Sequence, residues 1–275
     1  MIPPVVDAAF VDAHPDSVLV DVRWYLDGRD GRAAYEAGHL PGAVWVDLDT
    51  QLAAHDAPPT EGRHPFPTPE AFAAAMSAIG VGDGSTVVAY DDTGGVTAGR
   101  LAVMLRMSGH DAAILDGGLV AWPGAVETGW VEPVPATFTP RPWPAERLAS
   151  ADETMAAAES GSPVLDARSA ERFTGEVTQI DPRPGHIPGA RSAPWSAAVG
   201  DDGRLRSRDE LREHFRSLGV TDDTPAIAYC GSGVSACLNV VAIELAGFAP
   251  PRLYVASWSG WSADPDRPAD LGPSR

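Results

Sequence analysis

One cysteine of this chain stands where a thiol could act as a nucleophile. The stretch from Ala226 to Gly247 reads AIAYCGSGVSACLNVVAIELAG, so Cys230 follows a short apolar run and precedes small residues. A short apolar run predicts a buried strand, and the residues from about Ala236 onward predict a helix. Cys230 therefore lies at a predicted strand-to-helix turn, a place suited to sulfur chemistry.

The turn after Cys230 has the composition of a loop that holds negative charge. Two glycines let the backbone curl tightly, so that successive N–H groups point inward. The helix N-terminus adds further donors and a partial positive charge. Such a ring stabilises a thiolate, an anionic substrate or the outer sulfur of a persulfide. The residues expected to form it are Gly231, Ser232, Gly233, Val234 and Ser235.

Other uses of these residues fit the sequence less well. A cysteine-dependent phosphatase needs an arginine six residues after its cysteine, and here that residue is Ala236. The second cysteine, Cys237, falls on the predicted helix and is expected to pack as a small apolar group. No Cys-x₂-Cys pair exists and the histidines are scattered, so no metal site is expected.

The chain repeats itself once, which predicts two homologous domains. GHLPGA from Gly38 matches GHIPGA from Gly185, and VLVDVR from Val18 matches VLDARS from Val164. We predict a domain over residues 1–125, an extended Pro-rich linker over 126–148 and a second domain over 149–275. At the position of Cys230 the first copy has Asp91, which cannot act as a sulfur nucleophile.

Residues shared by both copies are predicted to be structural, because they recur where the nucleophile does not. They comprise two histidines and two aspartate–arginine pairs expected to be ion pairs: His39, His186, Asp21 with Arg23, and Asp166 with Arg168.

Within each copy, short apolar runs alternate with helical patterns. VLVDVR, AVWVDL, TVVAYD and AAILDG predict strands, and TPEAFAAAMSAIG predicts a helix capped by Thr68. This alternation indicates the α/β class, with a mostly parallel sheet flanked by helices on both faces. In such sheets ligands bind beyond the carboxyl ends of the strands, which is where Cys230 lies.

The composition excludes several classes of protein. The 275 residues carry a net charge of −18 and include no lysine, which argues against nucleic-acid binding. The N-terminus has neither the basic start nor the apolar run of a signal peptide, and no stretch is long enough to span a membrane. A cytoplasmic, reduced protein without a disulfide is expected.

With these motifs in view, the chain resembles the tandem-domain rhodanese-family sulfurtransferases, and most of all their 3-mercaptopyruvate branch. The two repeats and the CGSGVSAC loop carry the resemblance. It implies two rhodanese-like domains, with an inactive N-terminal copy and a Cys230 that carries sulfane sulfur. It also implies pyruvate as product, no cofactor, and a thiol, thioredoxin or cyanide as acceptor. A monomer is expected.

The resemblance also assigns roles to individual residues. Ser232 matches a loop serine that the family pairs with a histidine and an aspartate of the first domain, here His64 and Asp49. Arg172 matches the arginine that binds the substrate carboxylate. The second family arginine would fall at Asp181, so Arg183 is the nearest substitute. Two alternatives stay open: thiosulfate as donor, and a non-catalytic carrier or protein-binding module.

Overall fold

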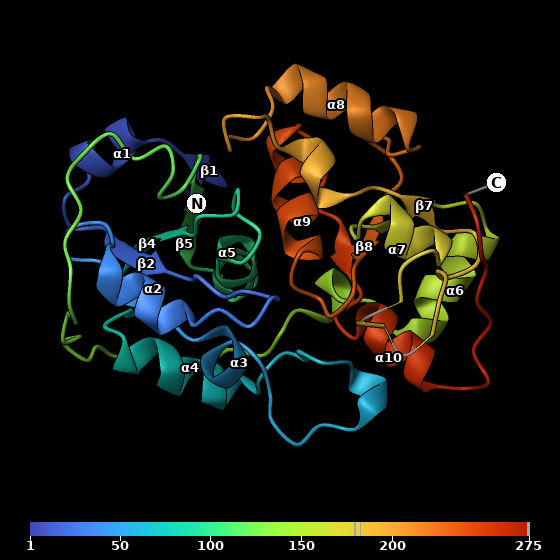
Figure 1. The fold of residues 1–275 in the computed structure, drawn as a ribbon, viewed down its shortest axis with the longest axis horizontal. Coiled ribbons are helices and arrows are strands. Elements are labelled where there is room, and N and C mark those ends of the chain that lie inside the picture. The colour runs from blue at the N-terminus through green and yellow to red at the C-terminus, as the bar shows by residue number, and fades with distance from the viewer. Residues whose placement is uncertain (179, 182, 274–275) are drawn as a thin grey trace. The chain divides into compact units, whose positions relative to one another are not determined.

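The computed structural model describes residues 1–178, 180–181 and 183–273. They divide into two compact units, coloured mostly blue to green and mostly yellow to red in Figure 1. Unit 1 comprises residues 1–55, 66–143 and 201–205. Unit 2 comprises the remaining described residues from Asp56 onward, including the short segment 56–65. Segment 56–65 thus belongs to unit 2, although it lies between two parts of unit 1 in the sequence. Segment 201–205 belongs to unit 1, although it lies between two parts of unit 2.

Unit 1 contains a five-stranded sheet in the order β1-β5-β4-β2-β3, with all pairs parallel. Its strands are β1 (Val5–Val6), β2 (Val18–Asp21), β3 (Val44–Trp45), β4 (Thr86–Tyr90) and β5 (Asp111–Leu115). Its helices are α1 (Ala8–Ala13), α2 (Gly31–Ala37), α3 (Leu48–Gln51), α4 (Pro69–Ala78) and α5 (Ala98–Met107).

Unit 2 contains a four-stranded sheet in the order β7-β6-β8-β9, again with parallel pairs. Its strands are β6 (Val164–Asp166), β7 (Arg191–Ser192), β8 (Ile227–Tyr229) and β9 (Arg252–Leu253). Its α-helices are α6 (Ala151–Glu159), α7 (Ala170–Thr174), α8 (Arg208–Ser217), α9 (Ala236–Leu245) and α10 (Ser257–Ala263). Three 3₁₀ turns join them: η1 (Pro59–Glu61), η2 (Ala145–Arg147) and η3 (Trp195–Ala198).

The two sheets have one topology, which confirms the predicted duplication and α/β class. Strands β5-β4-β2-β3 of unit 1 correspond to β9-β8-β6-β7 of unit 2. The edge of the sheet next to β5 also has its counterpart in unit 2. Strand β1 pairs with β5 in unit 1, and an isolated parallel bridge joins Leu148 to Leu253 of β9 in unit 2. The bridges His39–Glu127 and His186–Asp270 also match.

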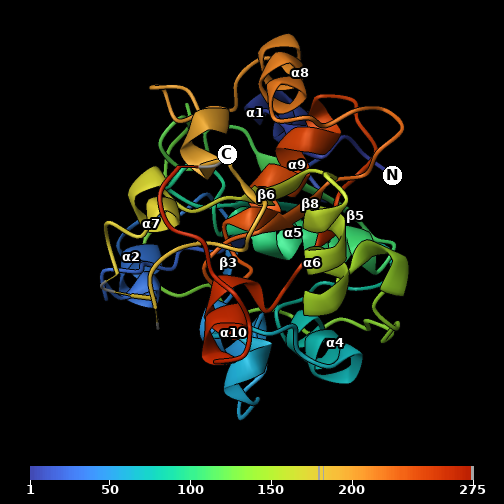
Figure 2. The ribbon, with the colours of Figure 1, turned by 90° about the vertical axis from the view of Figure 1, so that its right-hand side faces the viewer.

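Helices cover both faces of each sheet because the central strands are buried at consecutive positions, so that both faces are apolar. In unit 2, Ile227 and Tyr229 share one buried cluster with Trp258 and Trp261 of α10. Helix α9 packs on β8 and β9 from the other side, and Figure 2 shows α9 and α10 on opposite sides of β6 and β8. In unit 1, Val88 and Tyr90 join a cluster with Phe10 of α1, while α5 packs on β4 and β5.

Local signals set where the helices begin. Thr68 accepts a hydrogen bond from the N–H of Ala71 at the start of α4, as the sequence predicts. Ser150 and Ser207 form reciprocal capping boxes with glutamates three residues later, at the starts of α6 and α8. No helix among the described residues is both long and apolar enough to cross a lipid bilayer.

Each strand that precedes a GHxPGA loop ends in a buried ion pair. Arg23 binds both carboxylate oxygens of Asp21 and donates to the carbonyl of Gly38 at 2.6 Å. Arg168 binds Asp166 in the same way and donates to Gly185. These pairs fix the GHxPGA loops onto the strand ends, which confirms them as structural ion pairs.

The two histidines that recur in the repeat also contact backbone carbonyl groups. Nδ1 of His39 lies 2.9 Å from the carbonyl of Tyr35, and Nδ1 of His186 lies 2.9 Å from that of Phe173. Each imidazole stacks on the ring of that same residue. The geometry is that of loop anchors, as the repetition in the sequence predicts.

Breaking one of the buried pairs should destabilise its unit. Asp21→Asn keeps the shape of the side chain but leaves the buried Arg23 without a countercharge, which typically costs about 3–5 kcal/mol. Urea unfolding followed by far-UV circular dichroism measures the loss. Asp27→Asn is the matched control, because the Asp27–Arg29 pair is exposed and should give no measurable change. Equal effects of the two changes would contradict the structural role of the buried pair.

Candidate active site

The loop after β8 has the predicted form. Cys230 follows Tyr229 directly, and α9 begins at Ala236. Gly233 adopts a φ of 76°, in the left-handed region that glycine tolerates, and thereby turns the loop toward the helix. Cys230 is 1% exposed. The thiol therefore lies at the carboxyl end of a central strand, inside a tight loop, as expected of a ligand site in a parallel sheet.

The start of α10 clamps the backbone of this loop. The N–H of Trp258 donates to the carbonyl of Cys230, and that of Ser259 to the carbonyl of Gly231, both at 2.9 Å. The N–H of Cys230 donates to the hydroxyl of Ser257 at 3.1 Å. Together these bonds fix the position of the cysteine main chain.

Ser257 is a positioning residue that the sequence pattern did not single out. Its φ of 54° is unusual for a residue with a side chain and has an energetic cost of about 1–3 kcal/mol. The equivalent position of unit 1 is Gly118, with a φ of 51°. The N–H of the next residue, Leu119, donates to the backbone carbonyl of Asp91, just as the N–H of Trp258 donates to that of Cys230. A serine in this strained position supplies a hydroxyl to Cys230 that glycine lacks.

Unit 1 shows what the loop can hold. The Asp91 carboxylate, fully buried, accepts hydrogen bonds of 2.8–3.0 Å from four backbone N–H groups and one hydroxyl. The donors are the N–H groups of Thr93, Gly95, Thr97 and Ala98 and the hydroxyl of Thr97. The loop is thus a ring of donors around an anion, filled in unit 1 by its own side chain.

Ser232 and His64 are brought together within unit 2. The hydroxyl of Ser232 lies 2.9 Å from Nδ1 of His64, although the two residues are 168 positions apart. His64 belongs to the segment 56–65, which packs against α10. A hydroxyl hydrogen-bonded to an imidazole can relay a proton.

Two glycines allow this segment to approach α10. A Cβ on Gly260 would lie 2.5 Å from the carbonyl oxygen of Thr60, and one on Gly62 would lie 2.4 Å from that of Ala256. Side chains at these positions would push the segment away.

Arg63 is a site residue that sequence reasoning missed. A Cβ on Gly231 would lie 2.7 Å from Nη2 of Arg172 and 3.1 Å from Nη2 of Arg63, so both guanidinium groups face the residue next to Cys230. Arg63 also donates to the carbonyl of Ile180 at 2.9 Å. The sequence offered one indication that Arg63 could belong to the site, namely that it directly precedes His64, a predicted site residue, in GRHPFP.

Arg63 lies near both positively and negatively charged groups. Burial lowers the pKa of the Arg63 guanidinium, the charges of Arg172 and Arg168 act in the same direction, and those of Asp181 and Cys230 oppose them. A positive charge in such a place gains from a nearby anion. The site therefore favours a negatively charged ligand.

Arg172 lies in the site, but one of its edges is already used. Nε and Nη2 donate to the two carboxylate oxygens of Asp181 at 2.9 and 2.6 Å. Asp181 is buried, and it also accepts from Nη1 of Arg168 at 3.3 Å and lies 4.0 Å from Nη1 of Arg63. A ligand carboxylate can therefore approach Arg172 only by its remaining edge.

Arg183 takes part in other contacts. Its Nη2 donates to the carbonyl of Arg267 at 2.5 Å, and its guanidinium lies 5.9 Å from the Trp258 ring centroid. Neither contact is with the Cys230 loop. Its substitution for the second family arginine stays a prediction, and Arg63 is the guanidinium that the structure brings beside Arg172.

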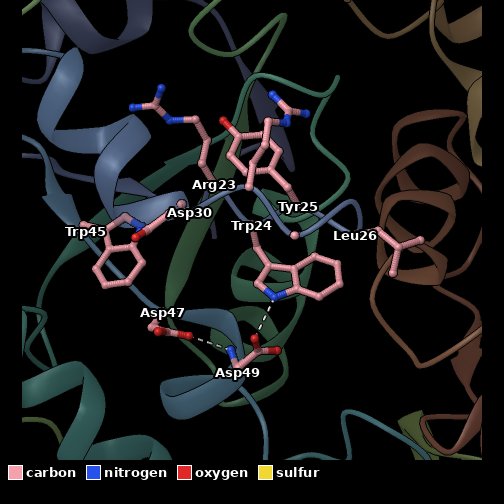
Figure 3. Close-up of a pocket in the computed structure, with 11 residues that line it drawn as sticks. Arg23, Trp24, Tyr25, Leu26, Asp30, Trp45, Asp47 and Asp49 are labelled. Atoms are coloured by element: carbon pink, nitrogen blue, oxygen red, sulfur yellow. Dashed lines mark hydrogen bonds between the residues drawn. The ribbon is translucent and has the colours of Figure 1, made fainter.

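Asp49 lies in unit 1, in the wall of a cavity of about 450 Å³. Figure 3 shows it below Trp24, whose indole Nε1 donates to the Asp49 carboxylate at 2.8 Å, and near Asp47, which accepts from the Asp49 N–H. Asp49 and His64 therefore belong to different compact units. The Asp49 part of the predicted relay stays a prediction.

Comparison with known proteins places these features in context. The rhodanese-like domain family matches residues 8–125 and 150–264. The chain is 40% identical over 268 residues to the probable 3-mercaptopyruvate sulfurtransferase of Pseudomonas aeruginosa, covering 94% of each chain. It is 38% identical over 272 residues to the putative thiosulfate sulfurtransferase SseB of Mycobacterium tuberculosis, covering 96% of this chain and 94% of that one.

The fold agrees with solved structures as well. The crystal structure of SseA from Escherichia coli, a 3-mercaptopyruvate sulfotransferase with the rhodanese fold, superposes with a TM-score of 0.82 at 33% identity. It covers 94% of this chain and 99% of that chain.

A methyl group on Gly231 should disturb the anion site without unfolding the protein. The added Cβ would meet the flexible ends of Arg63 and Arg172, which can move aside. We expect Gly231→Ala to weaken the binding of pyruvate, a small carboxylate, by about tenfold, because a charge-assisted contact is lost. Isothermal titration calorimetry measures the affinity. Gly84→Ala, at an open turn glycine whose φ suits an L residue, is the control. Unchanged pyruvate affinity in Gly231→Ala would rule out an anion site at this place.

Proposed function

Because this chain belongs to the rhodanese family and is a sulfurtransferase, we propose that it moves sulfane sulfur from 3-mercaptopyruvate to a thiophilic acceptor through a persulfide on Cys230. The observation that carries the proposal is the placement of two guanidinium groups, Arg63 and Arg172, against the residue that follows the cysteine. A carboxylate bound there would be close to the thiol. This is what transfer from a small keto acid requires.

In the first half-reaction the Cys230 thiolate attacks the sulfur of the donor. A sulfur–sulfur bond forms, the carbon–sulfur bond of the donor breaks, and its electron pair passes to the departing carbon as the enolate of pyruvate. The sulfur retains its hydrogen or loses it to solvent. Protonation of the enolate carbon gives pyruvate, and the protein holds one added sulfur.

The Ser232–His64 pair would move the proton. Ser232 is two residues from the nucleophile, and its hydroxyl contacts the imidazole of His64. A serine hydroxyl can donate to the enolate while the imidazole restores its proton. Asp49 would assist by orienting the imidazole, as in other carboxylate–histidine–hydroxyl relays.

The loop would hold the persulfide between the half-reactions. The corresponding loop of unit 1 surrounds the Asp91 carboxylate with backbone donors, and the outer sulfur of a persulfide is likewise an anion. The donors would come from Gly231, Ser232, Gly233, Val234 and Ser235. An acceptor thiolate or cyanide then attacks the outer sulfur, the sulfur–sulfur bond breaks, and its electron pair returns to Cys230 as thiolate.

The choice of donor follows from charge. Of the relatives, one bears the name of a 3-mercaptopyruvate enzyme and another that of a thiosulfate enzyme. The loop positions after Cys230 are Gly231 and Ser232, and the chain has no lysine, so no cation projects from the loop itself. Mercaptopyruvate carries one negative charge and thiosulfate carries two. We therefore favour mercaptopyruvate, with thiosulfate as the second candidate.

The proposal includes a setting for the enzyme. The acceptor is a small thiol or a thioredoxin-type protein, no cofactor takes part, and the protein acts as a monomer in the cytoplasm. The described residues include no group of three or more His, Cys, Asp or Glu side chains placed to hold a metal ion.

Cys230 is the residue on which the chemistry depends. Cys230→Ser should fold but transfer no sulfur, because an alcohol cannot form the persulfide. Intact-protein mass spectrometry after treatment with mercaptopyruvate should show one added sulfur in the native protein and none in this variant. The matched control is Cys237→Ala, since the Cys237 thiol lies in α9 and donates to the carbonyl of Gly233. Added sulfur on Cys237 would refute the proposal.

The donor preference can be measured directly. Steady-state rates of thiocyanate formation from cyanide, with each donor in turn, should give a kcat/KM for mercaptopyruvate at least about tenfold above that for thiosulfate. That is the order expected when one charge lacks a partner. An equal or higher kcat/KM for thiosulfate would contradict the assignment of mercaptopyruvate as the preferred donor and leave only the general sulfurtransferase activity.

A further inference from the structure

The arginines beside Cys230 belong to a buried cluster with a definite charge. Asp181 contacts three guanidinium groups: it accepts from Arg172 and Arg168 and lies 4.0 Å from Arg63. Arg168 also pairs with Asp166 at 2.6 Å. Three positive and two negative charges leave the cluster with one net positive charge.

This net charge is directed at the nucleophile. The Nη2 atoms of Arg63 and Arg172 are the nearest side-chain atoms to the position of a Cβ on Gly231, next to Cys230. Asp181 contacts both of these arginines, and its side chain is only 2% exposed. Solvent therefore screens this carboxylate poorly, and its charge is felt by any anion held against the two arginines.

We infer that Asp181 is a specificity-determining residue, which sets the charge of the anion site so that it accepts a donor with one negative charge and rejects one with two. The inference rests on the proposed function for its choice of donors. Asp181 is a positioning residue: it touches the arginines and acts on the donor through them.

Charge balance gives the physical reason. Counted together with the Cys230 thiolate, a bound monocarboxylate leaves one negative charge uncompensated and a dianion leaves two, which costs more in a place where water is scarce. Asp181 also occupies the Nε–Nη2 edge of Arg172, so the donor meets a single remaining edge. An asparagine at this position would remove the negative charge and raise the net charge of the cluster to two.

Kinetics with both donors test the inference. We expect Asp181→Asn to reduce the ratio of kcat/KM for mercaptopyruvate to that for thiosulfate by about tenfold or more, the order produced by one unit charge a few ångström away. Asp181→Glu, which keeps the charge, should keep the ratio within about threefold of the native value. Asp222→Asn is the matched control, because Asp222 pairs with Arg212 at an exposed position of the same unit.

A role of Asp181 in folding alone gives a different result. Loss of structure would reduce both donor reactions together and leave their ratio unchanged, and that outcome would overturn the inference. The complementary change, Arg63→Gln, removes a positive charge and should raise the ratio while it weakens both donors.

Binding of unreactive anions separates this inference from the proposed function. Titration calorimetry with pyruvate and with sulfate should show that Asp181→Asn tightens sulfate binding about tenfold more than pyruvate binding. If the native protein fails to use mercaptopyruvate and the sulfate effect is present, the proposed function is wrong and the charge selector stands. If mercaptopyruvate is used and sulfate affinity does not respond to Asp181→Asn, the selector is wrong and the proposed function stands.

Discussion

A buried negative charge at the end of a β-strand must be surrounded by donors, and this requirement shapes the loop after the central strand of both units. In unit 1 the charge is the carboxylate of Asp91, and four backbone N–H groups and a hydroxyl bind it. The corresponding residue of unit 2 is Cys230, whose thiolate or persulfide needs the same ring. The loop of unit 1 is thus filled by its own carboxylate, and we propose that the corresponding loop of unit 2 serves the chemistry of Cys230.

The remaining features of unit 2 hold that loop in place and bring charged and polar side chains to it. The start of α10 fixes the backbone of Cys230, with Ser257 in a strained left-handed conformation to supply the hydroxyl. Segment 56–65 packs on the same helix, because Gly62 and Gly260 leave room for its backbone, and it delivers Arg63 and His64 to the loop. The proposed nucleophile, the proposed proton relay and the two arginines that face Gly231 thus come from three separate parts of the sequence.

Asp181 alters both the net charge around the two arginines and the edge by which Arg172 can bind a ligand. In the resemblance, a second arginine belongs at its position, and the sequence alone suggests that a substrate contact is missing. In the structure Arg63 and Arg172 both face Gly231, and Asp181 contacts both, occupies one edge of Arg172 and offsets part of the positive charge. The departure from the family pattern is therefore a change in the charge of the site as well as in its hydrogen bonds.

The sequence by itself determined the duplication, the parallel α/β class, the strand-to-helix turn at Cys230 and the structural pairs Asp21–Arg23 and Asp166–Arg168. Each depends on local patterns: apolar runs, glycine turns, and residues two apart at a strand end. Only the tertiary structure decided that segment 56–65 packs within unit 2, that Arg63 faces Gly231 and that Asp181 contacts three guanidinium groups. The contacts of segment 56–65 join residues more than a hundred positions apart, as in Arg63–Ile180 and His64–Ser232. Such pairings depend on which loop fits against which helix, and fit is a property of packed backbone that no local pattern encodes.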